Sequence, residues 1–262
     1  MVIDLKGKQA IVSGSTQGIG FSIAMELATA GASVVLISRD KPALRKAMEK
    51  LPNSGQQQHE LIVADFARPN ELSAALQTAI VKSGKTNILV NNTGGPPPGP
   101  LIEADAEALR IAFNMHVICN HILTQAVVEG MKKSGYGRII NIISTSVKQP
   151  IPGLGVSNTI RAAVANWAKT LSLELGPFGI TVNNVLPGGT STERLNSLFA
   201  KEADRHGVSQ DAIRKEWLSK IPAGRFADAS EIAKAVAFLA SPHAAYINGI
   251  NLPVDGGRTG SL

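Results

Sequence analysis

Residues 13–20 read SGSTQGIG, and this stretch decides the fold because its three glycines lie between a strand pattern and a helix pattern. The strand pattern is the apolar run 9–13, and in the helix pattern, 19–30, apolar residues recur three and four positions apart. Glycines permit a tight turn and bring the backbone close to a pyrophosphate, whose charge then meets N–H groups at a helix N-terminus. The turn therefore predicts a dinucleotide site at Gly14, Ser15, Gln17, Gly18, Ile19 and Gly20. A purely structural turn is the alternative.

The same alternation of patterns continues along the whole chain. Short apolar, β-branched runs, typical of strands buried on both faces, occupy residues 9–13, 33–38, 61–64, 87–90, 138–143, 181–186 and 250–254. Helical spacing occupies residues 19–30, 44–51, 71–81, 106–133 and 160–175. Alternating strands and helices imply parallel βαβ units with right-handed crossovers. We therefore predict an α/β fold, a single doubly wound Rossmann domain over residues 1–262, with about seven parallel strands, helices on both faces, and a ligand crevice at the carboxyl ends of the strands.

Composition limits the class of protein. With 44% hydrophobic and 18% charged residues, the chain is expected to be globular. The net charge of +6 is spread along the chain, and only 4% of residues are aromatic, which argues against nucleic-acid binding. We see no apolar run near the ~20 residues that cross a bilayer and no secretion signal at the start, so we expect a cytoplasmic protein without membrane contact. The single cysteine, Cys119, is expected to be a small buried residue, and we assign no metal ligands.

The end of the second predicted strand favours one cofactor. A site for NAD usually carries a carboxylate about twenty residues after the glycine turn, but this position holds Ser38, followed by Arg39. A carboxylate would repel the 2′-phosphate of NADP, whereas an arginine can bind it. We therefore predict NADP(H). NAD(H) stays an alternative because Asp40 follows directly, and Arg39 could also be a solvated surface charge.

Six motifs agree in order and spacing with one family. They are the turn 14–20, Asp65-Phe66, Asn91-Asn92-Thr93-Gly94, Asn141-Ile142-Ile143-Ser144, Pro187-Gly188 and Asp255-Gly256-Gly257. With them the chain resembles the short-chain dehydrogenase/reductase family over nearly its full length, and it is similar overall to 3-oxoacyl carrier-protein reductases.

This resemblance implies further contacts with the cofactor. Asp65, with Phe66 beside it, would meet the adenine, residues 92–94 would line the cofactor, and the segment 187–192 would hold the nicotinamide amide. The residues assigned on this basis are Asp65, Phe66, Asn92, Thr93, Gly94, Pro187, Gly188, Thr190 and Thr192. From the residues alone, 91–94 indicates only a strand end and a turn. The resemblance also implies a homo-oligomer, a dimer or tetramer, paired through helices 106–133 and 160–175.

The chain departs from the family at the catalytic residues. Family members use a serine, a tyrosine, a lysine four residues after the tyrosine, and an asparagine on the preceding long helix. Here Ser144 matches the serine, but Ser157 and Arg161 stand at the tyrosine and lysine positions, and His116 stands at the asparagine position. No Tyr-x-x-x-Lys occurs anywhere in the sequence.

These replacements change the chemistry that the site can perform. Serine is a far weaker acid than tyrosine, and arginine supplies charge and donors but does not release a proton near neutral pH. Histidine, with an ordinary pKa of ~6.5, suits proton transfer. Our hypothesis is that His116 relays the proton, through water or Ser157, while Ser144 orients a carbonyl and Arg161 holds ribose and charge; Arg161 is thus counted with both the catalytic and the cofactor residues. A packed helix residue is the alternative for His116.

Two loops flank the predicted crevice. Residues 94–100 read GGPPPGP, too rich in proline for a helix or a central strand, and we interpret them as a stiff wall of the substrate cleft or as a surface connector. By the resemblance, residues 191–220 form a substrate lid, and we interpret its arginines, Arg194, Arg205 and Arg214, as mostly solvated.

Three functions are compatible with these observations. The first is an NADP-dependent oxidoreductase that reduces a carbonyl, such as a 3-oxoacyl thioester, with a non-standard proton donor. The second is a protein that binds NADP without turnover and acts as a sensor or an assembly subunit. The third is different chemistry on the same scaffold, such as dehydration or epimerisation. For the enzyme, the expected partner is a small carbonyl or acyl substrate.

Overall fold

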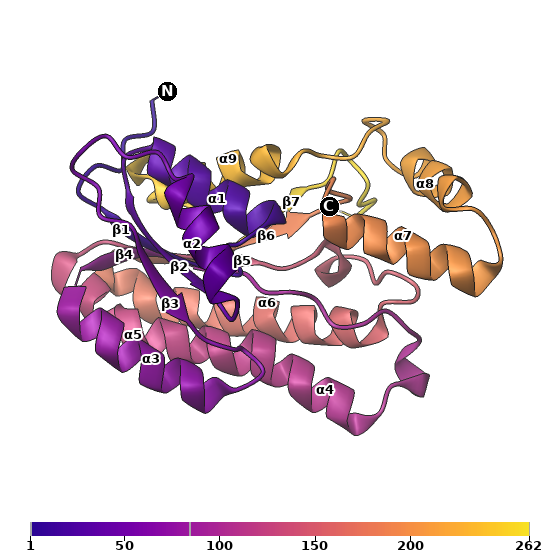
Figure 1. Ribbon diagram of the computed structural model, residues 1–262, viewed down its shortest axis with the longest axis horizontal. Coiled ribbons are helices and arrows are strands. Elements are labelled where there is room, and N and C mark those ends of the chain that lie inside the picture. Colours follow the sequence, from indigo (N-terminus) through magenta and orange to yellow (C-terminus); the bar gives the residue numbers. More distant parts are fainter. Residues whose placement is uncertain (1, 84, 262) are drawn as a thin grey trace.

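The computed structural model describes residues 2–83 and 85–261, except for the side chains of residues 78–83. In this part of the chain one parallel sheet of seven strands has the order β3-β2-β1-β4-β5-β6-β7 (Figure 1). The strands are β1 (Gln9–Ser13), β2 (Ser33–Ser38), β3 (Glu60–Val63), β4 (Thr86–Asn91), β5 (Gly137–Ile142), β6 (Ile180–Pro187) and β7 (Asn251–Val254). The predicted α/β fold is confirmed, and β1 and β2 have the predicted bounds.

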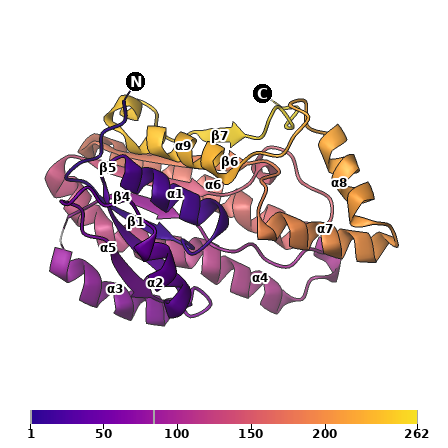
Figure 2. The same cartoon turned by 45° about the horizontal axis from the view of Figure 1, so that its top comes forward.

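Helices cover both faces of the sheet. On one face lie α1, α2 and α9, and on the other lie α3, α5 and α6, with α4 continuing the line of α5 (Figures 1 and 2). The helices α7 and α8 stand off the carboxyl ends of the strands, where the lid is predicted. The bounds are α1 (Gly18–Thr29), α2 (Lys41–Glu49), α3 (Pro69–Ser83), α4 (Ala106–Phe113), α5 (Cys119–Ser134), α6 (Gly155–Leu175), α7 (Glu193–His206), α8 (Gln210–Ser219) and α9 (Ala229–Ala240).

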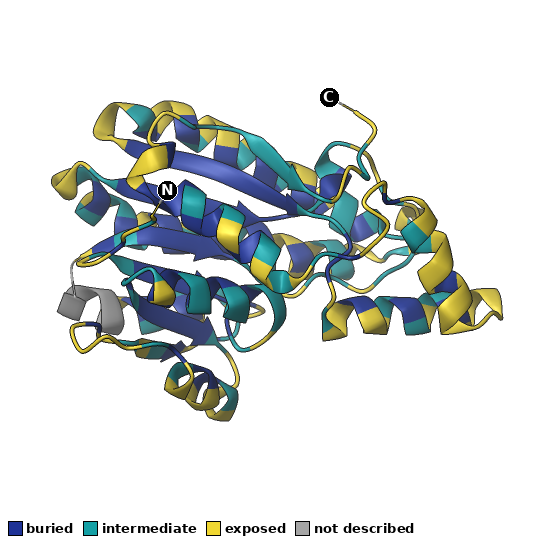
Figure 3. Ribbon diagram, turned by 90° about the horizontal axis from the view of Figure 1, so that it is seen from above, coloured by how far each residue is buried: buried dark blue, intermediate teal, exposed yellow. Residues whose placement is uncertain are grey.

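The strands are apolar throughout because each contributes to two cores. In β1, Ala10 and Val12 face the core under α1 and α9, whereas Ile11 faces the core under α3 and α5. All three side chains are at most 1% exposed. Figure 3 shows the buried sheet between helices that are buried only on their inner sides. This sandwich fixes the carboxyl ends of the strands, where the site is expected.

The long helix predicted over 106–133 is not one α-helix. The π-helical turn η2 (Asn114–Ile118) separates α4 from α5. By length and composition the whole stretch Ala106–Ser134 could also cross a membrane. The expectation that no apolar run approaches the ~20 residues that cross a bilayer is therefore wrong. Here the stretch packs along β4 and α3, and Leu123 and Met131 are fully buried in the core.

Four asparagines form a ladder across the sheet. Asn91 donates from Nδ2 to Oδ1 of Asn141, Asn141 donates to Asn184, and Asn184 donates to Asn251, each over 2.8 Å. The three contacts join β4, β5, β6 and β7 between residues that are paired in the sheet register. Asn91, Asn141 and Asn184 are at most 3% exposed. Buried amides that pair with one another in this way favour a single register, because a one-residue slip would break all three contacts.

Candidate active site

The glycine turn follows β1 directly and opens α1. Gly14 and Gly18 have φ angles of +59° and +55°, in the left-handed region that favours glycine. A Cβ on Gly20 would lie only 2.1 Å from the Gly14 carbonyl oxygen, and one on Gly14 would lie 2.7 Å from the Asn92 carbonyl oxygen. No side chain caps the N-terminus of α1. A turn that excludes side chains and ends at an uncapped helix N-terminus fits a pyrophosphate.

Asn92 fastens this turn to the end of β4. Its side-chain Nδ2 donates to the carbonyl oxygens of Ser13 and Gly14, over 3.2 and 3.0 Å. Its backbone N–H donates to the Ser13 hydroxyl, which in turn donates to the Asn92 carbonyl oxygen. The Asn92 side chain therefore holds the turn, and the half-buried Thr93 and the exposed Gly94 follow it along the loop.

The other predicted residues of the turn differ in their orientation. Ser15 is fully buried, and its hydroxyl accepts from the backbone N–H of Ile37 over 3.1 Å, so this side chain ties the turn to β2. Gln17 is exposed at the first position before α1, and Ile19 is half-buried and packs against the core. Contact between Ser15 and a ligand is therefore limited to its backbone.

At the end of β2, two charged neighbours have different environments. Arg39 is exposed and makes no hydrogen bond or ion pair with the described residues, and Ser38 before it is half-buried. Asp40 accepts from the backbone N–H of Ala43 over 2.9 Å and caps α2. NAD(H) was an alternative because the Asp40 carboxylate could bind the ribose. This carboxylate instead caps α2.

At the end of β3, the two predicted adenine contacts are also separated. Asp65 is half-buried, and its Oδ1 accepts from the backbone N–H of Ala67 over 3.0 Å. Phe66 is 6% exposed and packs into the core under α3, so its ring belongs to the core. The Phe66 carbonyl oxygen also points inward, because it accepts from the buried Cys119 thiol over 3.3 Å.

The segment after β6 returns to the glycine turn. Gly188 lies so close to Asp255 that a Cβ would be 2.7 Å from the Asp255 Cα. Thr190 is buried, and its hydroxyl donates to the carbonyl oxygen of Gly188. Thr192 caps α7, and its Cγ2 lies 3.4 Å from the position of a Cβ on Gly18. Sheet and lid thus meet at the start of α1, next to Pro187 and Gly188.

Ser144 and Arg161 belong to one arrangement at the end of β5. Ser144 lies two residues after the end of this strand and caps the short helix Thr145–Val147, accepting from the backbone N–H of Ser146 over 3.1 Å. Arg161, on α6, is 8% exposed and donates from Nη1 to the carbonyl oxygen of Ile142 over 2.9 Å. Its Nε has no hydrogen-bond partner. Burial and the nearby Arg194 charge lower the pKa of Arg161 to about 10, which leaves it charged at neutral pH.

Ser157 and His116 lie on the two helices beside this strand end. Ser157 is half-buried in the first turn of α6. His116 lies in the π-helical turn and is 2% exposed, and its Nε2 has no hydrogen-bond partner. Burial and the charge of Arg161 lower the pKa of His116 well below 6.5, against the opposing effect of the Gly94 backbone. His116 is therefore a neutral imidazole at rest, and the expectation that its pKa lies near 6.5 is wrong.

Arg194, which we expected to be a mostly solvated residue without a ligand, lies at the site. Its Nη2 donates to the carbonyl oxygen of Pro96 over 2.8 Å and lies 3.0 Å from the position of a Cβ on Gly95, and Nη2 of Arg161 lies 3.8 Å from the same point. Arg194 is exposed at the mouth of the site, but enough of it is covered to lower its pKa. A signal was present, because Arg194 is in the first turn of α7, where the helix dipole disfavours cations.

The proline-rich loop 94–100 is held at both ends. Arg194 binds it at Pro96, and Gly99 exchanges two backbone hydrogen bonds with the segment before α6, to the Gly153 carbonyl oxygen and from the Gly155 N–H, over 2.7 and 3.0 Å. The loop therefore joins the start of α7 to the start of the helix that carries Ser157 and Arg161. These contacts agree with its interpretation as a stiff wall.

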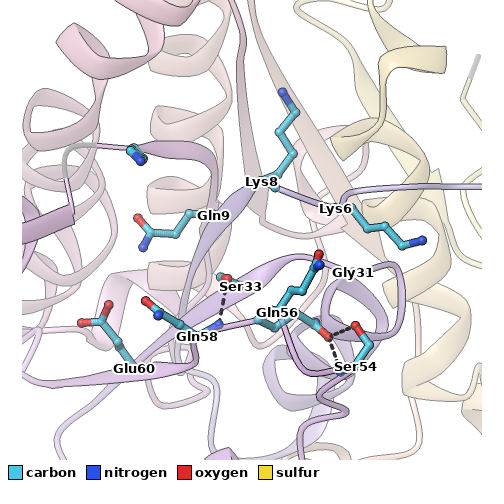
Figure 4. Close-up of a pocket in the computed structure, with 12 residues that line it drawn as sticks. Lys6, Lys8, Gln9, Gly31, Ser33, Ser54, Gln56, Gln58 and Glu60 are labelled. Carbon is cyan, nitrogen blue, oxygen red and sulfur yellow. Dashed lines mark hydrogen bonds between the residues drawn. The ribbon is translucent and has the colours of Figure 1, made fainter.

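A hollow of about 440 Å³ lies at the opposite edge of the sheet. Lys6, Lys8 and Gln58 are among its lining residues, at the amino ends of β1, β2 and β3 (Figure 4). Gln57, which also lines the hollow, donates to the carbonyl oxygens of Ala28 and Ala32, so its amide stabilises the fold. None of the predicted site residues lines this hollow, and we assign it no catalytic role.

Comparisons with known proteins agree with this geometry. Residues 14–259 match the family model described as enoyl-(acyl carrier protein) reductase. The chain is 33% identical to the 3-oxoacyl-[acyl-carrier-protein] reductase FabG of Vibrio cholerae, covering 97% of this chain and 98% of that protein. It is 28% identical to the NADPH-dependent reductase BacG of Bacillus subtilis, covering 97% and 99%. The L-sorbose reductase of Gluconobacter frateurii, solved with NADPH and L-sorbose, superimposes with a TM-score of 0.93 at 30% identity, over 100% of both chains.

Proposed function

Since the chain belongs to the short-chain dehydrogenase/reductase family, we propose that it is an NADP(H)-dependent oxidoreductase that reduces a carbonyl with a non-standard proton donor. One juxtaposition carries this proposal. The glycine turn, Ser144 and Arg161 all lie at the carboxyl edge of the same sheet, where open α/β sheets bind their ligands.

The residues present fit NADP(H). The turn 14–20 and the uncapped N-terminus of α1 would hold the pyrophosphate, and the unpaired Arg39 would hold the 2′-phosphate. Asp65 would reach the adenine, and Thr190 and Thr192 would flank the nicotinamide. When bound, the cofactor supplies the hydride. The NADPH-bound and NADPH-dependent relatives support this choice over NAD(H).

The other residues would orient the carbonyl and manage charge. Ser144 would donate to the carbonyl oxygen, and Arg161 would stabilise the negative charge that develops there and bind the ribose. Ser157 would contribute only a hydroxyl. Because His116 rests as a neutral imidazole, it would relay a proton by accepting at one ring nitrogen and donating at the other. Residues 191–220 would close over this arrangement as a lid.

A substrate panel tests the proposal. Purified protein is mixed with NADPH and a series of ketones, aldehydes and 3-oxoacyl thioesters, and the nicotinamide absorbance is followed. Loss of absorbance with any member supports reductase activity. Tight NADPH binding with no turnover over the whole panel would instead support the second function, a binding protein that has lost the Tyr-x-x-x-Lys chemistry.

Two variants test the proton donor once a substrate is known. His116→Ala lowers turnover if His116 relays the proton, and unchanged turnover would contradict this role. The double variant Ser157→Tyr with Arg161→Lys restores the family pair. A large gain in rate would show that the missing pair limits the wild-type reaction.

We also propose a homo-oligomer paired through its long helices. Ile111 and Phe113 on α4 and Leu173 on α6 are 44%, 42% and 70% exposed, which is unusual for large apolar side chains and supports an interface there. Light scattering of the wild type and Leu173→Glu tests this, with a smaller assembly expected for the variant. An unchanged mass would exclude Leu173 from the interface.

A further inference from the structure

Two arginines, Arg161 and Arg194, form a cationic cluster with the neutral His116 around the backbone of residues 94–96. The Nη2 atoms of both arginines lie within 4 Å of one point beside Gly95. The charges of both arginines also act on His116. The cluster therefore joins three elements that are distant in sequence, namely the π-helical turn, α6 and the start of α7.

The described residues leave this cluster without a negative partner. Among the described residues, no ion pair involves either arginine, and no carboxylate contributes to the pKa of any member. Arg161 uses only Nη1 in a hydrogen bond, and its Nε is buried without a partner. Nε2 of His116 is also buried without a partner. Two like charges with unused donors, one of them buried, favour the binding of an anion between them.

The predicted sites for the anionic groups of the cofactor lie elsewhere. The pyrophosphate is assigned to the turn at the start of α1, and the 2′-phosphate to Arg39 after β2. The cluster instead lies at the carboxyl end of β5 and beside the wall loop, near Ser144. Its position therefore suits the second ligand, the carbonyl compound.

We propose that the substrate is a small oxo acid, whose carboxylate binds between Arg194 and the Nη2 side of Arg161, next to the carbonyl oxygen that Arg161 and Ser144 bind. This inference rests on the proposed reductase function and specifies its substrate class. The carbonyl carbon receives a hydride, the two electrons of which come from NADPH as it is oxidised to NADP⁺. The carbonyl oxygen receives one proton from solvent by way of His116. The C=O double bond becomes C–OH, and the product is the corresponding hydroxy acid.

Arg194 would act as the specificity residue because of its place on the lid. Its present hydrogen bond to Pro96 uses one Nη2 donor and leaves the rest of the guanidinium free for a carboxylate. A carboxylate held by both arginines would also join α6 to the start of α7. Binding of the acid is therefore expected to close the lid.

A binding experiment tests this inference without turnover. NADPH-saturated protein is titrated calorimetrically with malonate and succinate, and with malonamide, which is neutral and similar in shape. We expect the wild type to bind at least one dicarboxylate and not malonamide. Arg194→Gln should weaken dicarboxylate binding at least tenfold, whereas Lys201→Gln, which removes an exposed charge from the same helix, should not.

Separate outcomes distinguish the possible failures. If neither dicarboxylate binds the wild type at tens of millimolar, or if malonamide binds equally, the inference is wrong even if ketones are reduced. If Arg194→Gln instead weakens NADPH binding tenfold, measured by NADPH fluorescence, the cluster serves a cofactor phosphate and the inference is also wrong. Dicarboxylate binding, together with no oxidation of NADPH by any oxo acid or by any member of the substrate panel, would keep the anion site and reject the proposed reductase function.

A kinetic experiment then checks the reacting compound. The ratio of kcat/KM for a 2-, 3- or 4-oxo acid to that for its methyl ester is compared between the wild type and Arg194→Gln. We expect this ratio to fall at least tenfold in the variant, with the value for the ester unchanged. An equal loss for acid and ester would contradict recognition of the carboxylate.

Discussion

Two buried arginines at opposite edges of the same sheet have opposite surroundings. Arg138, at the amino end of β5, is 3% exposed and donates to the carbonyl oxygens of Gly137, Gly179 and Ser241, while its guanidinium lies 4.1 Å from the centre of the Tyr136 ring. Arg161, at the carboxyl end, is 8% exposed and has one carbonyl partner.

The difference distinguishes a buried arginine that stabilises the fold from one that is available to a ligand. Neither arginine pairs with a carboxylate in the described chain, and burial lowers the pKa of both. At the amino edge the protein compensates the desolvated charge with carbonyl dipoles and an aromatic face. At the carboxyl edge it leaves Nε unpaired and adds a second cation, Arg194. Compensation is therefore left to a ligand.

The largest expected effect tests the structural arginine. Arg138→Ala leaves three carbonyl oxygens without this donor and opens a cavity, so we expect a loss of about 3 kcal/mol in the free energy of unfolding. Urea denaturation followed by circular dichroism measures it. Stability within about 0.5 kcal/mol of the wild type would remove the contrast between the two arginines.

The second prediction concerns the matching change at the other edge. Arg161→Met removes a buried charge and only one hydrogen bond, so we expect the free energy of unfolding to stay within about 1 kcal/mol of the wild type. Turnover of a confirmed substrate should fall about 10²-fold, because the donor for the developing charge is lost. Marked destabilisation of this variant would place Arg161 in the same class as Arg138.

The third prediction uses the pH dependence of His116. Its pKa is well below 6.5 in the folded protein and near 6.5 in the unfolded chain. Below pH 6.5 the unfolded chain therefore binds a proton here that the folded chain does not, and stability falls with acidification until the folded pKa is reached. Above pH 6.5 both states are neutral.

The variant His116→Asn removes this dependence. We expect it to lose less stability than the wild type between pH 6.5 and pH 5, by up to about 2 kcal/mol, in parallel urea titrations. Identical losses would show that His116 is compensated in the folded protein, as Arg138 is.

The smallest effects are expected at the end of β2, where one neighbour holds the fold and the other is free. Asp40→Ala removes the cap of α2 and should cost about 1 kcal/mol of stability with no change in NADPH affinity. Arg39→Ala should leave stability unchanged and weaken NADPH binding about tenfold, with NADH binding unchanged. Fluorescence titration measures both affinities. Equal losses for both cofactors would remove Arg39 from the 2′-phosphate site.

The fold could be predicted because local patterns and global packing agree. The run 9–13 is apolar at every position that faces a core, so β1 has the bounds of its pattern. The π-helical turn could not be predicted, since 106–133 keeps its helical periodicity through the interruption. Helix α9 lies outside the predicted helices, although Asp228 and Glu231 form a capping box before it that marks its start.

The site was less predictable because it depends on contacts between distant segments. Sequence could place Ser144 and Arg161 near each other through their strand and helix. It could not reveal that Asn92 holds the glycine turn, that the Phe66 ring enters the core, or that Arg194 approaches Gly95. Each of these contacts joins residues that are tens of positions apart in the sequence.

The asparagine ladder fixes the strand ends from which the site residues extend. Asn91, Asn141 and Asn184 are aligned in register, and counting forward from them gives Asn92 after one residue and Ser144 and Pro187 after three. The paired amides inside the sheet therefore fix the positions of these strand ends relative to one another. The residues beyond the ladder can change, as those at the catalytic positions have here, while the strand ends keep their relative positions.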